Sequence, residues 1–206
     1  MDNEYDAEAE HADAFMDTGF WGRKGAGCVV FALSTGRMLL AHRSEWVLEP
    51  HTWGTWGGAI DPTENPQMAA LRELTEETGF DAGDSARVIE SLVFESPGGD
   101  FRYHNFIVVV EHEYEPTLNW ESQGSAWVDP NDLPANLHPG LEALVTSDTA
   151  QVQLAELAKE ASSFQASATH TSQPTTAVER FSQALLAAER ALETEQKRPL
   201  RTPRMG

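Results

Sequence analysis

The chain has 206 residues, of which 40% are hydrophobic, and it carries a formal net charge of −19. This length is enough for one domain with a hydrophobic core and further segments at its ends. The strong negative charge argues against a general nucleic-acid-binding protein, because binding to phosphate backbones depends on clustered lysine and arginine.

The N-terminal segment is acidic and weakly periodic, so we expect residues 1–21 to be flexible. It lacks the apolar core of a signal peptide, and no stretch of the chain approaches the ~20 apolar residues of a membrane-spanning helix. Cys28 is the single cysteine, which excludes an intrachain disulfide and favours a buried thiol. These features predict a cytoplasmic protein with no membrane partner.

Five apolar runs rich in valine, isoleucine, phenylalanine and tryptophan predict strands. They span residues 27–33, 37–42, 88–94, 103–110 and 125–128. Turn residues at 34–36 and at 96–100 separate neighbouring runs. Together with helical patterns at about 66–78 and 141–146, the runs predict an α/β fold with a mixed sheet rather than a parallel doubly wound sheet.

Two tryptophans, Trp53 and Trp56, flank Gly54 after the second predicted strand. Aromatic rings beside a glycine-rich loop can stack on a base, but large aromatics at a strand end more often belong to the core. We expect Trp56 in the core. For Trp53 both interpretations stay open, and it is a candidate for substrate binding.

The helix expected at about 66–78 has signals at both ends. Asn65 is a favourable N-cap, and Pro66 suits the first helical position, where its fixed φ helps and no N–H is needed. Gly79 stands where helices end in a left-handed residue. Leu71, Leu74 and Thr78 form a stripe that can face a core.

Glu73, Glu76 and Glu77 project together from another side of this helix. Like charges at these spacings destabilise an isolated helix by about 0.2–0.5 kcal/mol per pair. A bound Mg²⁺ or Mn²⁺ would explain the cluster, because hard cations prefer carboxylate oxygen. The alternative is a solvated acidic face on which Arg72 pairs with Glu76.

Residues 58–80 read GAIDPTENPQMAALRELTEETGF and follow the pattern G-x5-E-x7-R-E-(apolar)-x-E-E-x-G-(apolar). This pattern resembles the signature of the Nudix hydrolases at every fixed position, and a looser resemblance extends over about 25–145. The resemblance implies an α/β/α sandwich that binds divalent metal. It also implies an enzyme that hydrolyses a diphosphate linkage in a nucleoside diphosphate derivative.

The resemblance implies roles for individual residues as well. The expected metal-site residues are Glu73, Glu76, Glu77, the carbonyl of Gly57 and, as a supporting or outer member, Glu64. Arg72 is expected to hold the glutamates in position by ion pairing. A further carboxylate must accept a proton from the attacking water, and Glu73 and Glu121 both remain open as that base. Mg²⁺ is the expected cofactor, with Mn²⁺ as a substitute.

The substrate cues conflict. Ser96 opens an S-P-G turn that resembles ADP-ribose pyrophosphatases, which makes it a substrate-binding candidate. Segments 118–122, 127–128 and 137–140 resemble members that act on nucleoside triphosphates and oxidised nucleotides instead. The main hypothesis is a pyrophosphohydrolase of nucleotide derivatives. The alternatives are a non-catalytic nucleotide-sensing or scaffold module of the same fold and a hydrolase that removes RNA caps.

We expect the Nudix domain to span 22–150 and a helical extension to span 151–206. Within the extension, a Ser/Thr/Ala/Gln-rich stretch at about 162–176 predicts a linker. The apolar stripe after it, at 178–192, is typical of one helix that docks on the core or pairs with a second copy in a homodimer. A foreign protein partner ranks lower. The final residues form a basic tail, for which a solvated terminus is the default interpretation.

Overall fold

The computed structural model describes residues 23–83, 87–96 and 98–171. The chain divides into two compact units, Met1–Gln165 and Ala166–Gly206, and the sheet belongs to the first. Among the described residues, no helix has both the length and the apolar character needed to cross a membrane.

Seven strands of the described chain form one mixed sheet, accompanied by three helices. The strands are β1 (Lys24–Ala32), β2 (Arg37–Arg43), β3 (Trp53–Gly54), β4 (Trp56–Ala59), β5 (Arg87–Glu95), β6 (Arg102–Val110) and β7 (Ser122–Val128). The helices are α2 (Pro66–Thr78), α3 (Pro139–Thr146) and α4 (Asp148–Thr171).

Strand β1 organises the sheet. One of its edges pairs in parallel with β6 along its whole length, and β6 continues antiparallel to β5. The other edge is shared, because β4 pairs with residues 25–28 of β1 and β2 pairs with residues 30–32. Strands β7 and β3 then pair with β2. The mixed sheet predicted from the sequence is therefore confirmed.

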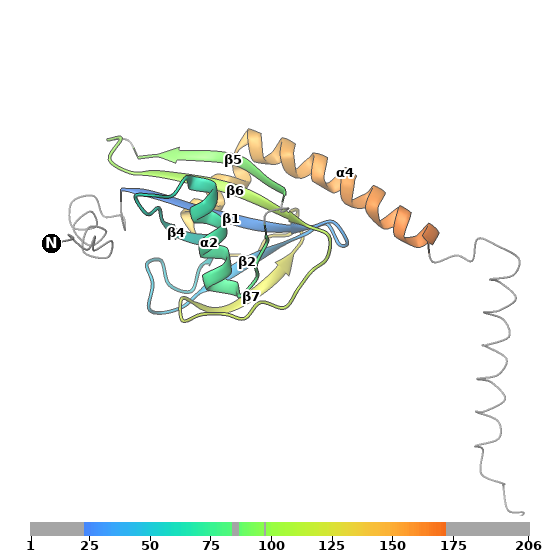
Figure 1. Cartoon of the computed structure of the whole chain (residues 1–206), viewed down its shortest axis with the longest axis horizontal. Helices are drawn as coiled ribbons and strands as arrows, with labels where there is room; N and C mark the ends of the chain where they lie inside the picture. The colour runs from blue at the N-terminus through green and yellow to red at the C-terminus, as the bar shows by residue number, and fades with distance from the viewer. Residues whose placement is uncertain (1–22, 84–86, 97, 172–206) are drawn as a thin grey trace, which may run out of the picture. The chain divides into compact units, whose positions relative to one another are not determined.

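The sheet is covered on both faces, so the α/β/α sandwich is confirmed as well (Figure 1). Alternate residues of β1 separate into two cores, as the period of a strand requires. Val29 and Phe31 pack with α3 and α4, whereas Cys28 and Val30 pack with the apolar side of α2, which includes Ala70 and Leu74. Both layers are needed because a strand buried on two faces has no side that tolerates water.

Helix α2 begins and ends where the sequence predicts. Asn65 Oδ1 accepts a hydrogen bond from the N–H of Met68, Pro66 occupies the first turn, and Gly79 takes a left-handed φ of 68°. Leu74 and Thr78 of the predicted stripe are buried, and Leu71 is partly buried against the same core. Trp56 is also fully buried, as expected, and its indole N–H donates to the carbonyl of Leu39. The Cys28 thiol is buried too.

The linker predicted at about 162–176 is wrong for residues 162–171, which form the last part of α4. Alanine, serine and glutamine are compatible with a helix, and the Ser162 and Ser163 hydroxyls donate back to carbonyls one turn earlier. Ala161 and Phe164 pack against the core on the α3 side of the sheet. The prediction failed because this composition is compatible with a helix, which Phe164 and the buried residues before it anchor on the core.

Two short strands, β3 and β4, were not predicted. Their glycines gave no strand signal, and their pairing with β1 and β2 supplies the stabilisation. The predictions for residues 1–21, for the stripe at 178–192 with its pairing, and for the basic tail fall outside the described residues.

Replacing a buried residue of α4 tests whether the helix is an integral layer. Leu157 is 1% exposed, whereas Val152, in the same helix, is 65% exposed. We expect Leu157→Ala to lower the free energy of unfolding by about 2–5 kcal/mol, because it leaves a cavity. Val152→Ala is the matched control and should change it by less than about 0.5 kcal/mol. Urea denaturation measures both, and equal effects would contradict the packing of α4.

Candidate active site

The acids of α2 face strand β4 at very short range. Glu77 is only 4% exposed, and its Oε1 accepts a 2.6 Å hydrogen bond from the N–H of Gly57. A Cβ atom on Gly58 would lie 2.6 Å from Oε1 of Glu73. A side chain on Gly58 would push the Glu73 carboxylate away, whereas one on Gly57 would clash with strand β1 and the Tyr103 hydroxyl.

Arg72 binds several acids at once. Its Nε and Nη2 donate to the two oxygens of Glu64 at 2.8 and 3.1 Å, and Nη2 also donates to the carbonyl of Ala59. Its Nη1 donates to Glu73 at 2.8 Å and to Glu76 at 3.1 Å. The predicted ion pairing of Arg72 with the glutamates is present in this geometry. The fork on Glu64 holds the guanidinium in one plane.

The loop before β7 brings Glu121 to the same place. The N–H of Thr117 donates to the carbonyl of Thr78, and the N–H of Asn119 donates to the carbonyl of Glu77, so the loop is tied to the end of α2. Asn119 Oδ1 accepts from the N–H of Glu121, whose own carbonyl accepts from Ser44. Glu121 is thus fixed from both sides, close enough to influence the acids of α2.

Burial and mutual repulsion shift the pKa values of these acids upwards. Burial raises the pKa of Glu73 to about 7, with further contributions from Glu76 and Glu121, although Arg72 opposes the shift. Burial, followed by the charge of Glu121, raises the pKa of Glu77 well above its ordinary value. Burial also raises the pKa of Glu121. The site thus holds more buried negative charge than its own cations balance.

The three acids of α2, which were expected to project from one side of the helix, differ in their environment. The Glu76 side chain is 55% exposed, while Glu77 is buried. Within residues 23–83, 87–96 and 98–171, no three His, Cys, Asp or Glu side chains converge in an arrangement that could already hold a metal ion. The donor chemistry nevertheless fits a hard cation, because Glu77 is a buried carboxylate whose direct partner is a neutral N–H.

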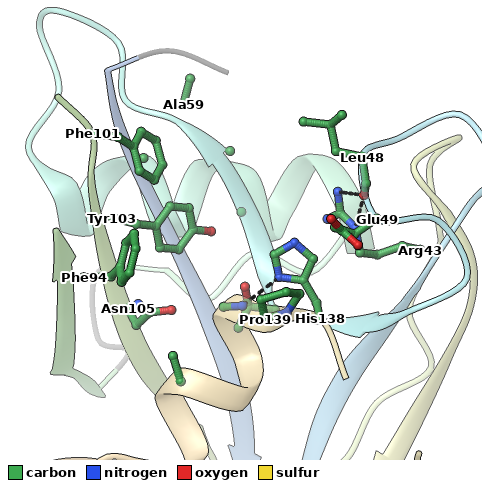
Figure 2. Close-up of a pocket in the computed structure, with 16 residues that line it drawn as sticks. Arg43, Leu48, Glu49, Ala59, Phe94, Phe101, Tyr103, Asn105, His138 and Pro139 are labelled. Atoms are coloured by element: carbon green, nitrogen blue, oxygen red, sulfur yellow. Dashed lines mark hydrogen bonds between the residues drawn. The ribbon is translucent and has the colours of Figure 1, made fainter. Parts of the chain in front are cut away.

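A cleft of about 490 Å³ adjoins these acids. Gly57 and Gly58 line it, so the same short strand touches both the carboxylates and the cleft. Figure 2 shows Phe94, Phe101, Tyr103 and Asn105 on one side and Arg43 on the other. The cleft therefore has an aromatic end and a charged end.

Arg43 holds the loop that follows β2. Its Nε and Nη2 both donate to the carbonyl of Leu48, at 2.9 and 2.7 Å. Burial lowers the pKa of Arg43, while Glu77 is the foremost of the acids that raise it, followed by Tyr103 and Glu121. A cation in this position lies within electrostatic range of both the cleft and the acids.

Most predicted site residues come together, and two do not. Trp53 stacks on His42 with ring centroids 4.5 Å apart, and Ser96 accepts a hydrogen bond from the N–H of Phe101 in the turn between β5 and β6. Neither lines the cleft, and their substrate-binding role stays a prediction. Sequence reasoning missed Arg43 and Asn105. A signal for Asn105 was present, since this amide falls on the same strand alternation as Ile107 and Val109 within the predicted strand 103–110.

A family model for the NUDIX domain matches residues 22–147. The chain belongs to the Nudix family. The predicted family is therefore confirmed, and the named relatives and solved structures of this family are hydrolases. Nudix enzymes generally use divalent metals.

Several named proteins resemble this Nudix chain. A Mycobacterium tuberculosis protein provisionally named 8-oxo-dGTP diphosphatase 3 is 35% identical over 134 residues, or 60% of this chain and 61% of the relative. The match thus spans about three fifths of that relative's length. A Bacillus subtilis protein with the same provisional activity is 32% identical over 55% of this chain and 72% of its own. The crystal structure of the Nudix hydrolase RenU from M. smegmatis is 29% identical, with a TM-score of 0.55 over 68% of this chain and 88% of that one.

The raised pKa of Glu73 predicts how stability depends on pH. A carboxyl whose folded-state pKa is about 7 instead of 4.5 binds its proton more tightly in the folded state. Stability without metal should therefore fall as pH rises from about 4.5 to 7. Thermal unfolding in EDTA measures this trend.

Glu73→Gln should reduce that pH dependence, because an amide does not titrate, while the raised pKa values of Glu77 and Glu121 keep part of it. Glu111→Gln is the matched control, since it removes the same charge from an exposed acid and relieves general repulsion equally. If stability fell with rising pH as steeply in both variants as in the wild type, the buried Glu73 carboxyl would not be the cause of that fall.

Proposed function

We propose that this protein is a divalent-metal-dependent pyrophosphohydrolase of nucleotide derivatives, with nucleoside triphosphates, including oxidised ones, as the preferred class. One observation carries the proposal. Strand β4 places buried carboxylates on one side and the wall of a roughly 490 Å³ aromatic cleft on the other. A ligand with an aromatic ring in the cleft would extend its phosphates towards the acids. The provisional names of the two bacterial relatives support the same class.

Glu73, Glu76 and Glu77 would hold Mg²⁺ together with the carbonyl of Gly57, while Glu64 supports the site through Arg72. Glu73 and Glu76 would then give up their hydrogen bonds to Arg72, which retains Glu64 and the Ala59 carbonyl. A bound divalent cation supplies charge neutralisation on the phosphates and makes an attacking water more acidic.

The chain's own residues supply the remaining needs of the reaction. Arg43 lines the charged end of the cleft and can pair with phosphate oxygens, which compensates for a net charge that repels anions. Either Glu73 or Glu121 accepts the proton of the attacking water. Glu73 lies against Gly58 at the wall of the cleft, and the loop that carries Glu121 is hydrogen bonded to the end of α2.

The acids also bear on the competing functions. A nucleotide-sensing or scaffold module needs the cleft but has no need for a buried carboxylate such as Glu77. Nothing in the cleft favours removal of RNA caps over hydrolysis of a free nucleotide. We therefore retain hydrolysis of a free nucleotide as the proposed reaction.

Metal binding can be tested before activity. Mg²⁺ or Mn²⁺ should raise the melting temperature, because a ligand at ~100 times its Kd stabilises the folded state by about 2.7 kcal/mol. Glu76→Gln combined with Glu77→Gln should abolish this shift and leave the metal-free protein folded, since it relieves repulsion. Glu111→Gln, an exposed acid away from the site, should keep the shift. A double variant that still responds to Mg²⁺ would place the metal elsewhere.

The activity test follows product release with Mg²⁺ from a panel of nucleotides. It includes dGTP, 8-oxo-dGTP, dATP, ADP-ribose, NADH, dinucleoside polyphosphates and capped RNA. We expect turnover of a nucleoside triphosphate, with a loss of at least about 100-fold in Glu77→Gln, because one ligand and its charge are removed. Turnover of only capped RNA would favour cap removal. Nucleotide binding without any turnover would favour the sensing module.

A further inference from the structure

Asn105 occupies an unusual position for an amide. It lies in β6 on the same face as Ile107 and Val109, which belong to the core on the α3 side of the sheet. The residue is only 2% exposed. An amide in such a place is costly unless its polar atoms are hydrogen bonded.

The NH₂ group of the Asn105 amide has a hydrogen-bond partner. Its Nδ2 donates to the carbonyl of Leu92 at 3.2 Å, beside the register shift between Glu90 and Leu92 in β5. A carbonyl accepts but cannot donate, so the NH₂ group must face Leu92 and the orientation of the amide is determined. The oxygen consequently points the other way. It has no hydrogen-bond partner among the described residues.

The unpartnered oxygen faces the cleft. Phe94 pairs with Tyr103 and Leu92 pairs with Asn105 across β5 and β6, so Phe94, Tyr103 and Asn105 lie side by side on one face. All three line the cleft, and Figure 2 shows the Asn105 oxygen directed into it. Two aromatic rings and one buried acceptor therefore form its inner end, opposite the start of α3.

We infer that this end of the cleft is a base-reading subsite in which Asn105 Oδ1 accepts a hydrogen bond from an N–H of the substrate's base. The inference rests on the proposed function and adds the feature that selects among nucleotides. Aromatic walls suit a planar heteroaromatic ring, which can stack on them. The N–H groups of such a ring supply the donor that Oδ1 lacks. The phosphates then lie towards Arg43 and Gly58 at the other end.

This arrangement predicts discrimination against a base without a donor. Guanine offers imide and amino N–H groups, adenine offers an amino group, and 8-oxoguanine carries an additional ring N–H, whereas unsubstituted purine has none. A base with no N–H would leave a buried acceptor unpaired in the complex. Sites that form hydrogen bonds reject such analogues far more strongly than apolar pockets reject a change of size.

The first experiment uses the wild-type protein and compares kcat/KM for dGTP, 8-oxo-dGTP and dATP with that for the 2′-deoxyribonucleoside triphosphate of unsubstituted purine. We expect the unsubstituted purine to be at least about 10-fold poorer than the best of the three. The ranking of the other three shows which N–H is read. Equal values for all four would overturn the inference.

A variant then assigns the effect to Asn105. Asn105→Leu removes the acceptor, so the ratio between the best base and unsubstituted purine should fall towards 1. Loss of the bond to Leu92 lowers stability or activity for every substrate alike and leaves the ratio untouched. A variant that retains the wild-type ratio would overturn the role of Asn105. The wild-type comparison keeps the inference testable if Asn105→Leu does not fold.

Calorimetric binding of the same four nucleotides to wild-type protein and to Glu77→Gln separates this inference from the proposed function. Preferential binding without turnover would contradict the proposed hydrolysis and support the subsite. Turnover without any preference would support hydrolysis and overturn the subsite. If the protein neither binds nor hydrolyses any of the four, both are wrong.

Discussion

The close approach of helix α2 to strand β4 is the constraint on which the candidate site depends. Gly58 permits that approach, since a Cβ atom there would lie 2.6 Å from Oε1 of Glu73, and Gly57 permits the pairing of β4 with β1, since a Cβ atom there would clash with the β1 backbone. The backbone of β4 can therefore donate to Glu77 and form the cleft wall at once. A larger residue in place of Gly58 would move Glu73 away from the cleft wall.

This approach of α2 to β4 buries negative charge, and the other residues of the site either neutralise that charge or add to it. Arg72 neutralises part of it and is itself oriented by Glu64 and the Ala59 carbonyl. Glu121 adds to it from a loop that is bonded to the end of α2. Carboxylates kept close together in a buried site have raised pKa values and favour a cation. The close spacing of buried carboxylates therefore causes both the electrostatic repulsion and the proposed metal binding.

The two faces of the sheet carry different parts of the site. Helix α2 lies on one face with the acids, while α3 and α4 cover the other face, and residues of α3 line the cleft. Strand β4 pairs with the first part of β1 and contacts both the acids of α2 and the cleft. Parallel pairing of β1 with β6 places Gly25 beside Tyr103, where a Cβ atom would lie 2.5 Å from the ring. Small residues in β1 therefore make room for the aromatic wall.

The sequence by itself determined the features that depend on local chemistry. Helix α2, its caps, its acids and its guanidinium follow from residues within one short segment, and five strands follow from local patterns. Tertiary structure alone decided that Glu77 is buried while Glu76 is exposed, that 162–171 continues α4, and that Arg43 and Asn105 line one cleft. These outcomes depend on contacts between residues far apart in the chain, such as Asn105 with Leu92 or Gly57 with Glu77. Burial and cleft formation are properties of such contacts, which local periodicity does not encode.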